Sequence, residues 1–128
     1  MAETRKGRAN QKAFPRRGEI YLTALDPALG HEIKKTRPAL VIQNDVTNCF
    51  GLTTIVAAIT SKVSTPPYPN EVVIQPTGTG LGVVSTIRLD QIRTVDRQRL
   101  IQRFGKVDAQ VMHKVDAAIK ISLGLVRV

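Results

Sequence analysis

The chain has 128 residues, the size of one ordinary domain, and can bury a hydrophobic core without disulfides or a metal ion. Its formal net charge of +9 favours a polyanionic partner such as nucleic acid. The single cysteine, Cys49, excludes an internal disulfide, and no Cys/His spacing is typical of a zinc site. No apolar stretch approaches the roughly 18 residues of a membrane span, and no signal-peptide core is present, so we expect a cytoplasmic protein without a cofactor.

The first segment of the chain is strongly basic. Residues 1–17 carry six lysines and arginines against one carboxylate, Glu3, and contain one large apolar residue, Phe14. This composition is typical of a disordered segment. We therefore expect residues 1–15 to form a basic, disordered arm and residues 16–128 to form a single domain. The arm either strengthens nucleic-acid binding or only aids solubility, and both interpretations stay open.

A cation-rich loop follows the first predicted strand. Residues 18–25 alternate loosely between apolar and polar side chains, which predicts a strand ending at Asp26-Pro27. The next segment, residues 30–35 (GHEIKK), combines an imidazole, a carboxylate and two ammonium groups. We therefore expect the loop to present charged side chains to solvent or to a ligand.

Arg37 connects that loop to the second predicted strand, residues 39–43. Pro38 pushes the preceding residue into an extended conformation, so the backbone of Arg37 is fixed. The apolar run that follows, residues 39–42, predicts a strand buried on both faces. A guanidinium on such a fixed backbone is a fork of N–H donors suited to a phosphate. Taken alone, Arg37 fits equally well as a surface arginine beside solvated lysines.

The remaining elements predict a small barrel closed by one helix. Asp108 is a candidate N-cap for that helix, whose apolar residues recur at helical spacing. Proline and glycine clusters predict loops at residues 64–70 and 76–82, and a polar turn is predicted at 44–51. The other predicted strands are residues 52–59, 71–75, 83–87, 91–95 and 100–104.

Antiparallel pairing of the strands at 39–43 and 52–59 brings four side-chain chemistries together. The start of one strand then faces the end of the other, which places Arg37 beside Thr60. The preceding loop, with Glu32 and His31, ends at the same edge. Proximity of this kind also follows from any hairpin, so it does not by itself establish a site.

The order and spacing of several segments resemble the MazF/PemK family of toxin endoribonucleases over about residues 17–128. The segments are residues 17–21 (RGEIY), 25–27 (LDP), 30–32 (GHE), 35–42 (KTRPALVI), 57–61 (AAITS) and 90–96 (DQIRTVD). The resemblance implies a mainly β, SH3-like small barrel of the MazF/CcdB/PemK type with a C-terminal helix, and a homodimer. It also implies metal-independent, ribosome-independent cleavage of single-stranded RNA such as mRNA at short sequences, and growth arrest. An acidic, MazE-like antitoxin that blocks the RNA groove is implied as well.

The resemblance also assigns catalytic roles. Arg37 and Thr60 match the catalytic arginine and threonine, and Glu32 matches a glutamate tied to activity. His31 stands where many relatives carry serine, and it either contacts the substrate or transfers a proton. The identity of the general base and of the general acid stays open among Glu32, His31 and Arg37. The high pKa of arginine favours Arg37 as a clamp on the phosphate rather than as the acid.

A second set of residues is expected to bind RNA without taking part in the chemistry. Lysines position the strand through its phosphates, whereas acceptors and donors along the predicted groove can read base edges. Arg93 either joins this set or pairs with Asp90 or Asp96. The candidates for RNA contact are His31, Lys34, Lys35, Lys62, Ser85, Asp90, Gln91 and Arg93.

The expected reaction is attack of the RNA 2'-hydroxyl on the adjacent phosphate, which leaves a 2',3'-cyclic phosphate and a 5'-hydroxyl. Two noncatalytic alternatives share the fold: a CcdB-like toxin that binds a topoisomerase, and a nucleic-acid-binding barrel. The second is disfavoured because two Tyr, three Phe and no Trp offer few stacking platforms for a nucleic-acid strand.

Overall fold

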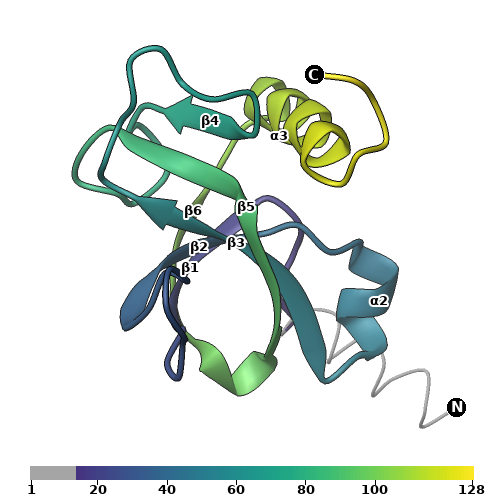
Figure 1. The fold of residues 1–128 in the computed structure, drawn as a ribbon. Helices are drawn as coiled ribbons and strands as arrows, with labels where there is room; N and C mark the ends of the chain where they lie inside the picture. The colour runs from purple at the N-terminus through teal and green to yellow at the C-terminus, as the bar shows by residue number, and fades with distance from the viewer. Residues whose placement is uncertain (1–13) are drawn as a thin grey trace, which may run out of the picture.

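Six antiparallel strands form one strongly curved, barrel-like sheet with a helix at its C-terminal end (Figure 1). The computed structural model describes residues 14–128. The strands are β1 (Glu19–Ala24), β2 (Thr36–Val41), β3 (Thr53–Thr60), β4 (Glu71–Ile74), β5 (Ser85–Asp96) and β6 (Leu100–Lys106), in the sheet order β4-β5-β3-β2-β1-β6. The helical elements are α2 (Asp45–Phe50), the 3-10 turn η1 (Arg97–Arg99) and α3 (Ala109–Ser122). The predicted small β fold with a C-terminal helix is confirmed.

The basic arm predicted over residues 1–15 falls almost entirely outside the described residues. Phe14 and Pro15 are the exceptions, and both are buried. The guanidinium of Arg16 lies 4.5 Å from the centre of the Phe14 ring, in a cation-π arrangement. The chain is therefore packed on the domain from residue 14 onward.

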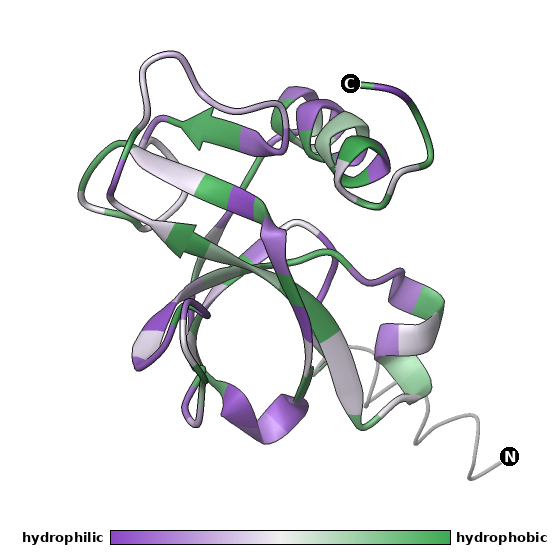
Figure 2. Ribbon diagram, viewed as in Figure 1, coloured by the Kyte–Doolittle hydropathy of each residue, from purple (hydrophilic) through white to green (hydrophobic). Residues whose placement is uncertain are grey.

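The middle strands are buried on both faces, as the continuous apolar run at residues 39–42 predicts. Alternate residues enter two separate cores: Leu40 and Ala57 join the core that packs on α3, whereas Ala39 and Val56 join the core on the other face. Figure 2 shows hydrophobic residues along β3, β4 and β5 and hydrophilic ones at η1. This double burial explains why the run has no alternation of apolar and polar residues.

Helix α3 begins and packs as the sequence predicts. The Asp108 carboxylate accepts the backbone N–H of Val111 at 2.9 Å, which is the N-cap interaction. Val115 and Ala118 are buried in the core, and the hydroxyl of Ser122 donates to the carbonyl of Leu89 at 2.6 Å. The end of the helix is thereby tied to β5.

Residues 44–51 contain the short helix α2, so the predicted polar turn is wrong. Asn44 is its N-cap and accepts the N–H of Thr47 at 2.8 Å. Asn48 is fully buried and bonds to Gln43 and Thr54. Asparagine favours turns and helix caps alike, because its short amide bonds to nearby backbone in both.

β5 is one strand of twelve residues, where two strands at residues 83–87 and 91–95 were predicted. Its pairing with β3 shifts register at that point: Ala57 lies opposite Ile92, but Ile59 lies opposite Ile87. The interruption predicted from Leu89 and Asp90 is therefore a bulge inside a continuous strand.

The predicted glycine-rich turn at residues 76–82 is a loop that packs on β6. The loop follows β4, and β4 and β6 are the two edge strands of the sheet. The Lys106 N–H of β6 donates to the Gly78 carbonyl at 3.3 Å, which links the loop to β6. Gly80 has φ +78°, and a Cβ there would overlap the carbonyl oxygen of Phe104. Only glycine fits this approach of two backbones.

We expect Gly80→Ala to lower the free energy of unfolding by at least about 1 kcal/mol, because alanine adds left-handed strain and a backbone clash. Gly82→Ala is the matched control, since a Cβ at Gly82 meets nothing within 4 Å. Urea denaturation of both variants measures the difference, and equal stabilities would contradict the described loop packing.

Candidate functional site

Arg37 and Thr60 lie on neighbouring strands and line the same cavity, of about 370 Å³. In the register of β2 and β3, Ala39 lies opposite Ala58, and extending it by two residues places Arg37 opposite Thr60. The juxtaposition predicted from the sequence is thus present. The other residues that line this cavity, called the Arg37 cavity below, are Pro38, Ile59, Ser61, Gly80, Leu81, Gly82, Val83, Ser85 and Phe104.

The guanidinium of Arg37 has no carboxylate partner among residues 14–128. Within the described part of the chain, its one hydrogen bond runs from Nε to the carbonyl oxygen of Lys34 at 3.4 Å. By contrast, Arg17 pairs with Asp116 and Arg103 pairs with Glu19. Arg37 therefore keeps most of its fork of donors for an anion that enters the cavity.

The hydroxyl of Thr60 is oriented by the backbone. Its oxygen accepts the N–H of Lys62 at 3.2 Å. Because a hydroxyl that accepts still carries its own proton, Thr60 can donate one hydrogen bond. The edge of the Arg37 cavity thus combines a fixed cation with a hydroxyl donor.

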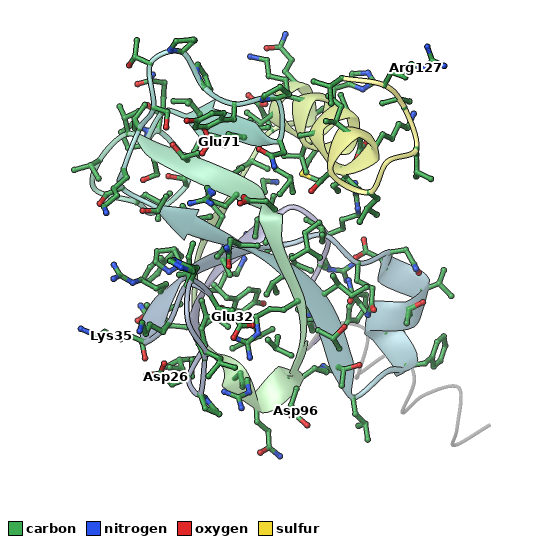
Figure 3. All side chains as sticks on the ribbon, viewed as in Figure 1. Asp26, Glu32, Lys35, Glu71, Asp96 and Arg127 are labelled. Carbon is green, nitrogen blue, oxygen red and sulfur yellow. The ribbon has the colours of Figure 1, made fainter. Side chains whose placement is uncertain are left out.

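Three contacts brace the loop between β1 and β2, residues 25–35. Arg93 donates to the Leu25 carbonyl at 2.7 Å, and the Gln91 side-chain oxygen accepts the Ile33 N–H at 3.2 Å. The Asp26 carboxylate accepts the N–H of Lys35 at 2.8 Å, where φ is +70°. Figure 3 shows Asp26 and Lys35 in the same half of the molecule. The left-handed Lys35 is a strained position that these bonds hold in place.

Gln91 and Arg93, two of the RNA-contact candidates, thus have structural partners. Arg93 was expected to bind RNA or to pair with Asp90 or Asp96, and its guanidinium bonds to the Leu25 carbonyl. The side-chain oxygen of Gln91 accepts the Ile33 N–H of the loop.

Neither Glu32 nor His31 enters the Arg37 cavity. The Glu32 carboxylate accepts the N–H of Leu29 at 2.5 Å, and the Glu32 N–H donates to the Leu29 carbonyl at 3.1 Å. His31 and Lys34 are exposed on the same loop. The structure therefore brings Arg37 and Thr60 together, but it leaves the proposed carboxylate and imidazole outside their cavity.

A second cavity, of about 600 Å³, shares Thr60 with the first. Here it is called the Arg88 cavity. Two of the candidates for RNA contact, Lys62 and Asp90, line it. The residues in it that the sequence analysis did not identify are Ser64, Tyr68, Pro69, Asn70, Glu71, Arg88, Ile121, Ser122 and Val128.

Asp90 is paired with Arg88, so both of its oxygens are engaged. The two groups form a bidentate pair, with Nε to Oδ1 at 2.8 Å and Nη2 to Oδ2 at 2.6 Å, and Glu71 lies 3.6 Å from the Arg88 Nε. The hydrogen bonds from Arg88 hold the pKa of Asp90 below its usual range, and those to Asp90 raise the pKa of Arg88.

We expect the pKa of Asp90 to rise towards its ordinary value in Arg88→Met, because that variant removes the two charge-assisted hydrogen bonds. By linkage, the pair stabilises the fold above the ordinary pKa of the carboxyl, and this stabilisation is lost as pH falls through the lowered pKa. NMR titration of the Asp90 carboxyl measures the shift. An unchanged pKa in the variant would show that the pair is absent in solution.

Comparison with known proteins identifies the family. A model of the PemK-like, MazF-like toxin of type II toxin-antitoxin systems matches residues 16–123. The chain belongs to this toxin family. It is 44% identical over 111 residues to endoribonuclease EndoA of Bacillus subtilis (strain 168), which spans 87% of this chain and 96% of that relative.

Solved structures of MazF proteins share the fold. MazF (Form-I) from Deinococcus radiodurans has a TM-score of 0.75 at 28% identity, over 87% of this chain and 97% of its own. The MazE-MazF structure (Form-II) from the same organism has a TM-score of 0.69 at 26% identity, over 88% of this chain and 98% of its own. The MazF-like barrel predicted from the sequence is thus confirmed.

Neither a membrane-spanning helix nor a cluster of metal ligands is present among residues 14–128. Within that part of the chain, no helix combines the length and apolarity that crossing a membrane requires. Over the same residues, no three His, Cys, Asp or Glu side chains gather in a way that could hold a metal ion.

Proposed function

We propose that this MazF-like toxin cleaves single-stranded RNA, such as mRNA in the cytoplasm, at a short specific sequence and without a metal ion or the ribosome. The observation that carries the proposal is the Arg37 guanidinium, which has no carboxylate partner within residues 14–128, beside the Thr60 hydroxyl in one cavity. The name of the B. subtilis relative, an endoribonuclease at 44% identity, supports the same activity. Cleavage of mRNA would inhibit translation and arrest growth.

The reaction proposed is transesterification within the RNA. The 2'-oxygen bonds to the adjacent phosphorus, the bond from phosphorus to the 5'-oxygen breaks, and the products carry a 2',3'-cyclic phosphate and a 5'-hydroxyl. Negative charge grows on the phosphoryl oxygens in the transition state. Arg37 and Thr60 supply fixed donors for that charge, which is the efficient use of a preorganised site.

The 2'-hydroxyl proton passes to a group near this cavity, and the leaving 5'-oxygen takes its proton from solvent water. We propose Glu32 as the group that accepts the 2'-hydroxyl proton, which requires its carboxylate to leave the Leu29 N–H when RNA binds. His31 is exposed and serves as a substrate contact. Arg37 acts as a clamp, because a guanidinium does not readily release a proton at neutral pH.

Lysines around the two cavities hold the RNA strand. Lys34 and Lys35 lie on the loop beside Arg37, and Lys62 lines the Arg88 cavity. Ser85 is buried in the wall of the Arg37 cavity, where its hydroxyl donates to the Val83 carbonyl at 3.0 Å. These groups position the phosphates and the backbone and carry no sequence information by themselves.

A homodimer is part of the proposal. Exposed apolar side chains follow α3 at the C-terminal end, and Val128 of this segment lines the Arg88 cavity. A second copy of the chain over this end would remove them from water. The exposed apolar residues of the segment are Leu123, Leu125, Val126 and Val128.

We expect wild-type protein to cut a long single-stranded RNA in excess EDTA, and Arg37→Ala to do so on the order of 100-fold more slowly or worse, because it loses a transition-state donor. Arg103→Ala is the control, since Arg103 is exposed on β6 and lines neither cavity. Fragment mapping by primer extension gives the rates. Intact RNA with wild type would instead favour a noncatalytic toxin that binds a protein such as a topoisomerase.

An acidic, partly disordered, MazE-like antitoxin is expected to inhibit the cleavage. The net charge of +9 favours such a partner, and MazE-MazF structures exist for the similar toxin of D. radiodurans. Titrating the RNA assay with the acidic product of the neighbouring gene should abolish cleavage near one equivalent of dimer. Undiminished cleavage at excess partner would refute this pairing.

A further inference from the structure

Phe14 fixes the point at which the basic N-terminal segment joins the domain. Its side chain is 6% exposed, and the Arg16 guanidinium lies over its ring. The Arg16 N–H donates to the Glu19 carboxylate at 2.7 Å, and the Glu19 N–H donates to the Arg16 carbonyl at 3.0 Å. Residues 1–13 are therefore joined to a packed turn at the start of β1.

The composition of residues 1–13 favours a nucleic-acid backbone as their partner. Four cations stand against one carboxylate, and the apolar residues are Met1 and three alanines. Such a segment offers charge to a phosphate backbone, but few anchors to the apolar core of a protein interface. It also precedes residues 16–123, the part of the chain that matches the toxin family. The cations are Arg5, Lys6, Arg8 and Lys12.

A cavity of about 710 Å³, called the Lys106 cavity below, continues the positive charge onto β6. Its cationic lining residues are Arg16, Arg17, Arg103 and Lys106. Arg17 pairs with Asp116, and Arg103 pairs with Glu19, so neither is part of the contact inferred here. Lys106 is exposed and forms no ion pair in the described part of the chain. Its ammonium group therefore remains available for an anion.

The carboxylates that line the Lys106 cavity are engaged by the protein. Glu19 accepts from Arg103. Asp45 accepts the N–H of Arg17 at 2.7 Å, and Asp108 caps helix α3. Because these acceptors already have donors, they compete weakly with a phosphate for Lys106.

The Lys106 cavity and the Arg37 cavity lie at opposite ends of β1. Glu19 begins β1 and lines the first cavity, whereas Ala24 ends β1 and lies opposite Thr36, the neighbour of Arg37. A strand of six residues spans about 20 Å. The Lys106 cavity also lies at the start of α3, whereas the proposed dimer contact follows the end of that helix. A long RNA held at Arg37 can therefore extend to this region, but a short oligonucleotide cannot.

We propose that residues 1–13 and Lys106 bind phosphates of the substrate RNA outside the catalytic groove, so that the toxin holds long RNAs more tightly than short ones. The inference rests on the proposed RNA cleavage and adds a second contact with the same strand. The contact reads no bases, because lysine and arginine bind phosphates in any sequence. It releases condensed counterions, so it weakens as the salt concentration rises.

One cleaved sequence presented in two substrates tests the role of the segment. The first substrate is a short oligonucleotide, and the second carries the same sequence within long, unstructured flanks. At low salt, wild type should cut the long substrate with a kcat/KM on the order of tenfold higher. A variant that combines Arg5→Gln, Lys6→Gln, Arg8→Gln and Lys12→Gln should lose this advantage and cut the short substrate at the wild-type rate.

The salt dependence of binding tests the role of Lys106. Fluorescence anisotropy with the long RNA, in an Arg37→Ala background that slows cleavage, gives the slope of log affinity against log salt. Lys106→Gln should reduce this slope by about 0.7, the value for one phosphate contact on a single strand. Lys114→Gln is the matched control and should leave it unchanged. Lys114 is exposed on α3, two residues from Met112, and residues at that spacing do not share a helix face with the cavity that Met112 lines.

The outcomes separate this inference from the proposed function. A length advantage that survives in the combined variant, or an unchanged salt slope in Lys106→Gln, overturns the inference and leaves the endoribonuclease intact. A combined variant that keeps the length advantage but escapes the antitoxin overturns it in favour of a protein partner. Loss of the advantage with normal cleavage of the short substrate supports it. Absence of Arg37-dependent cleavage of both substrates overturns the proposed function and this inference together.

Discussion

The register between β2 and β3 is the constraint on which the rest of the structure depends. Both strands are buried on both faces, so Leu40 enters one core while Ala39 enters the other. A shift by one residue would put a small side chain in place of a large one in one core and a large one in place of a small one in the other. Close-packed interiors do not tolerate such changes. The same register places Arg37 opposite Thr60. Core packing therefore fixes the geometry of the site as well as the fold.

The arginines around the site have two kinds of role: some bond to the protein backbone, and one is available to bind a ligand. Arg93 holds the start of the β1–β2 loop, and Arg99 bonds to the carbonyl of Ala24, at the end of β1, and to that of Asp26 in the loop. Arg37 lies where that loop ends and has no carboxylate partner in the described part of the chain. Because Arg93 and Arg99 are engaged with the backbone, the loop keeps its shape while Arg37 stays available for a phosphate.

Local rules predicted the part of the site that depends on backbone direction. Pro38, the apolar run after it and the antiparallel pairing expected with residues 52–59 together placed Arg37 beside Thr60. The role of Asp90 was not predictable in the same way, because it depends on a bulge in β5 and on the pairing of Arg88 across to β4. Side-chain partners on a shifted strand follow from tertiary pairing, which sequence alone specifies weakly.

The central claim is that the RNA supplies its own nucleophile while Arg37 and Thr60 stabilise the phosphate. A substrate with one 2'-deoxynucleotide on the 5' side of the cleaved bond tests it most directly. The account predicts that this bond stays intact, whereas a 2'-deoxynucleotide placed one position downstream is cut at the normal rate. Cleavage of the first substrate, with a 5'-phosphate on the released fragment, would show that water attacks instead and would contradict the mechanism.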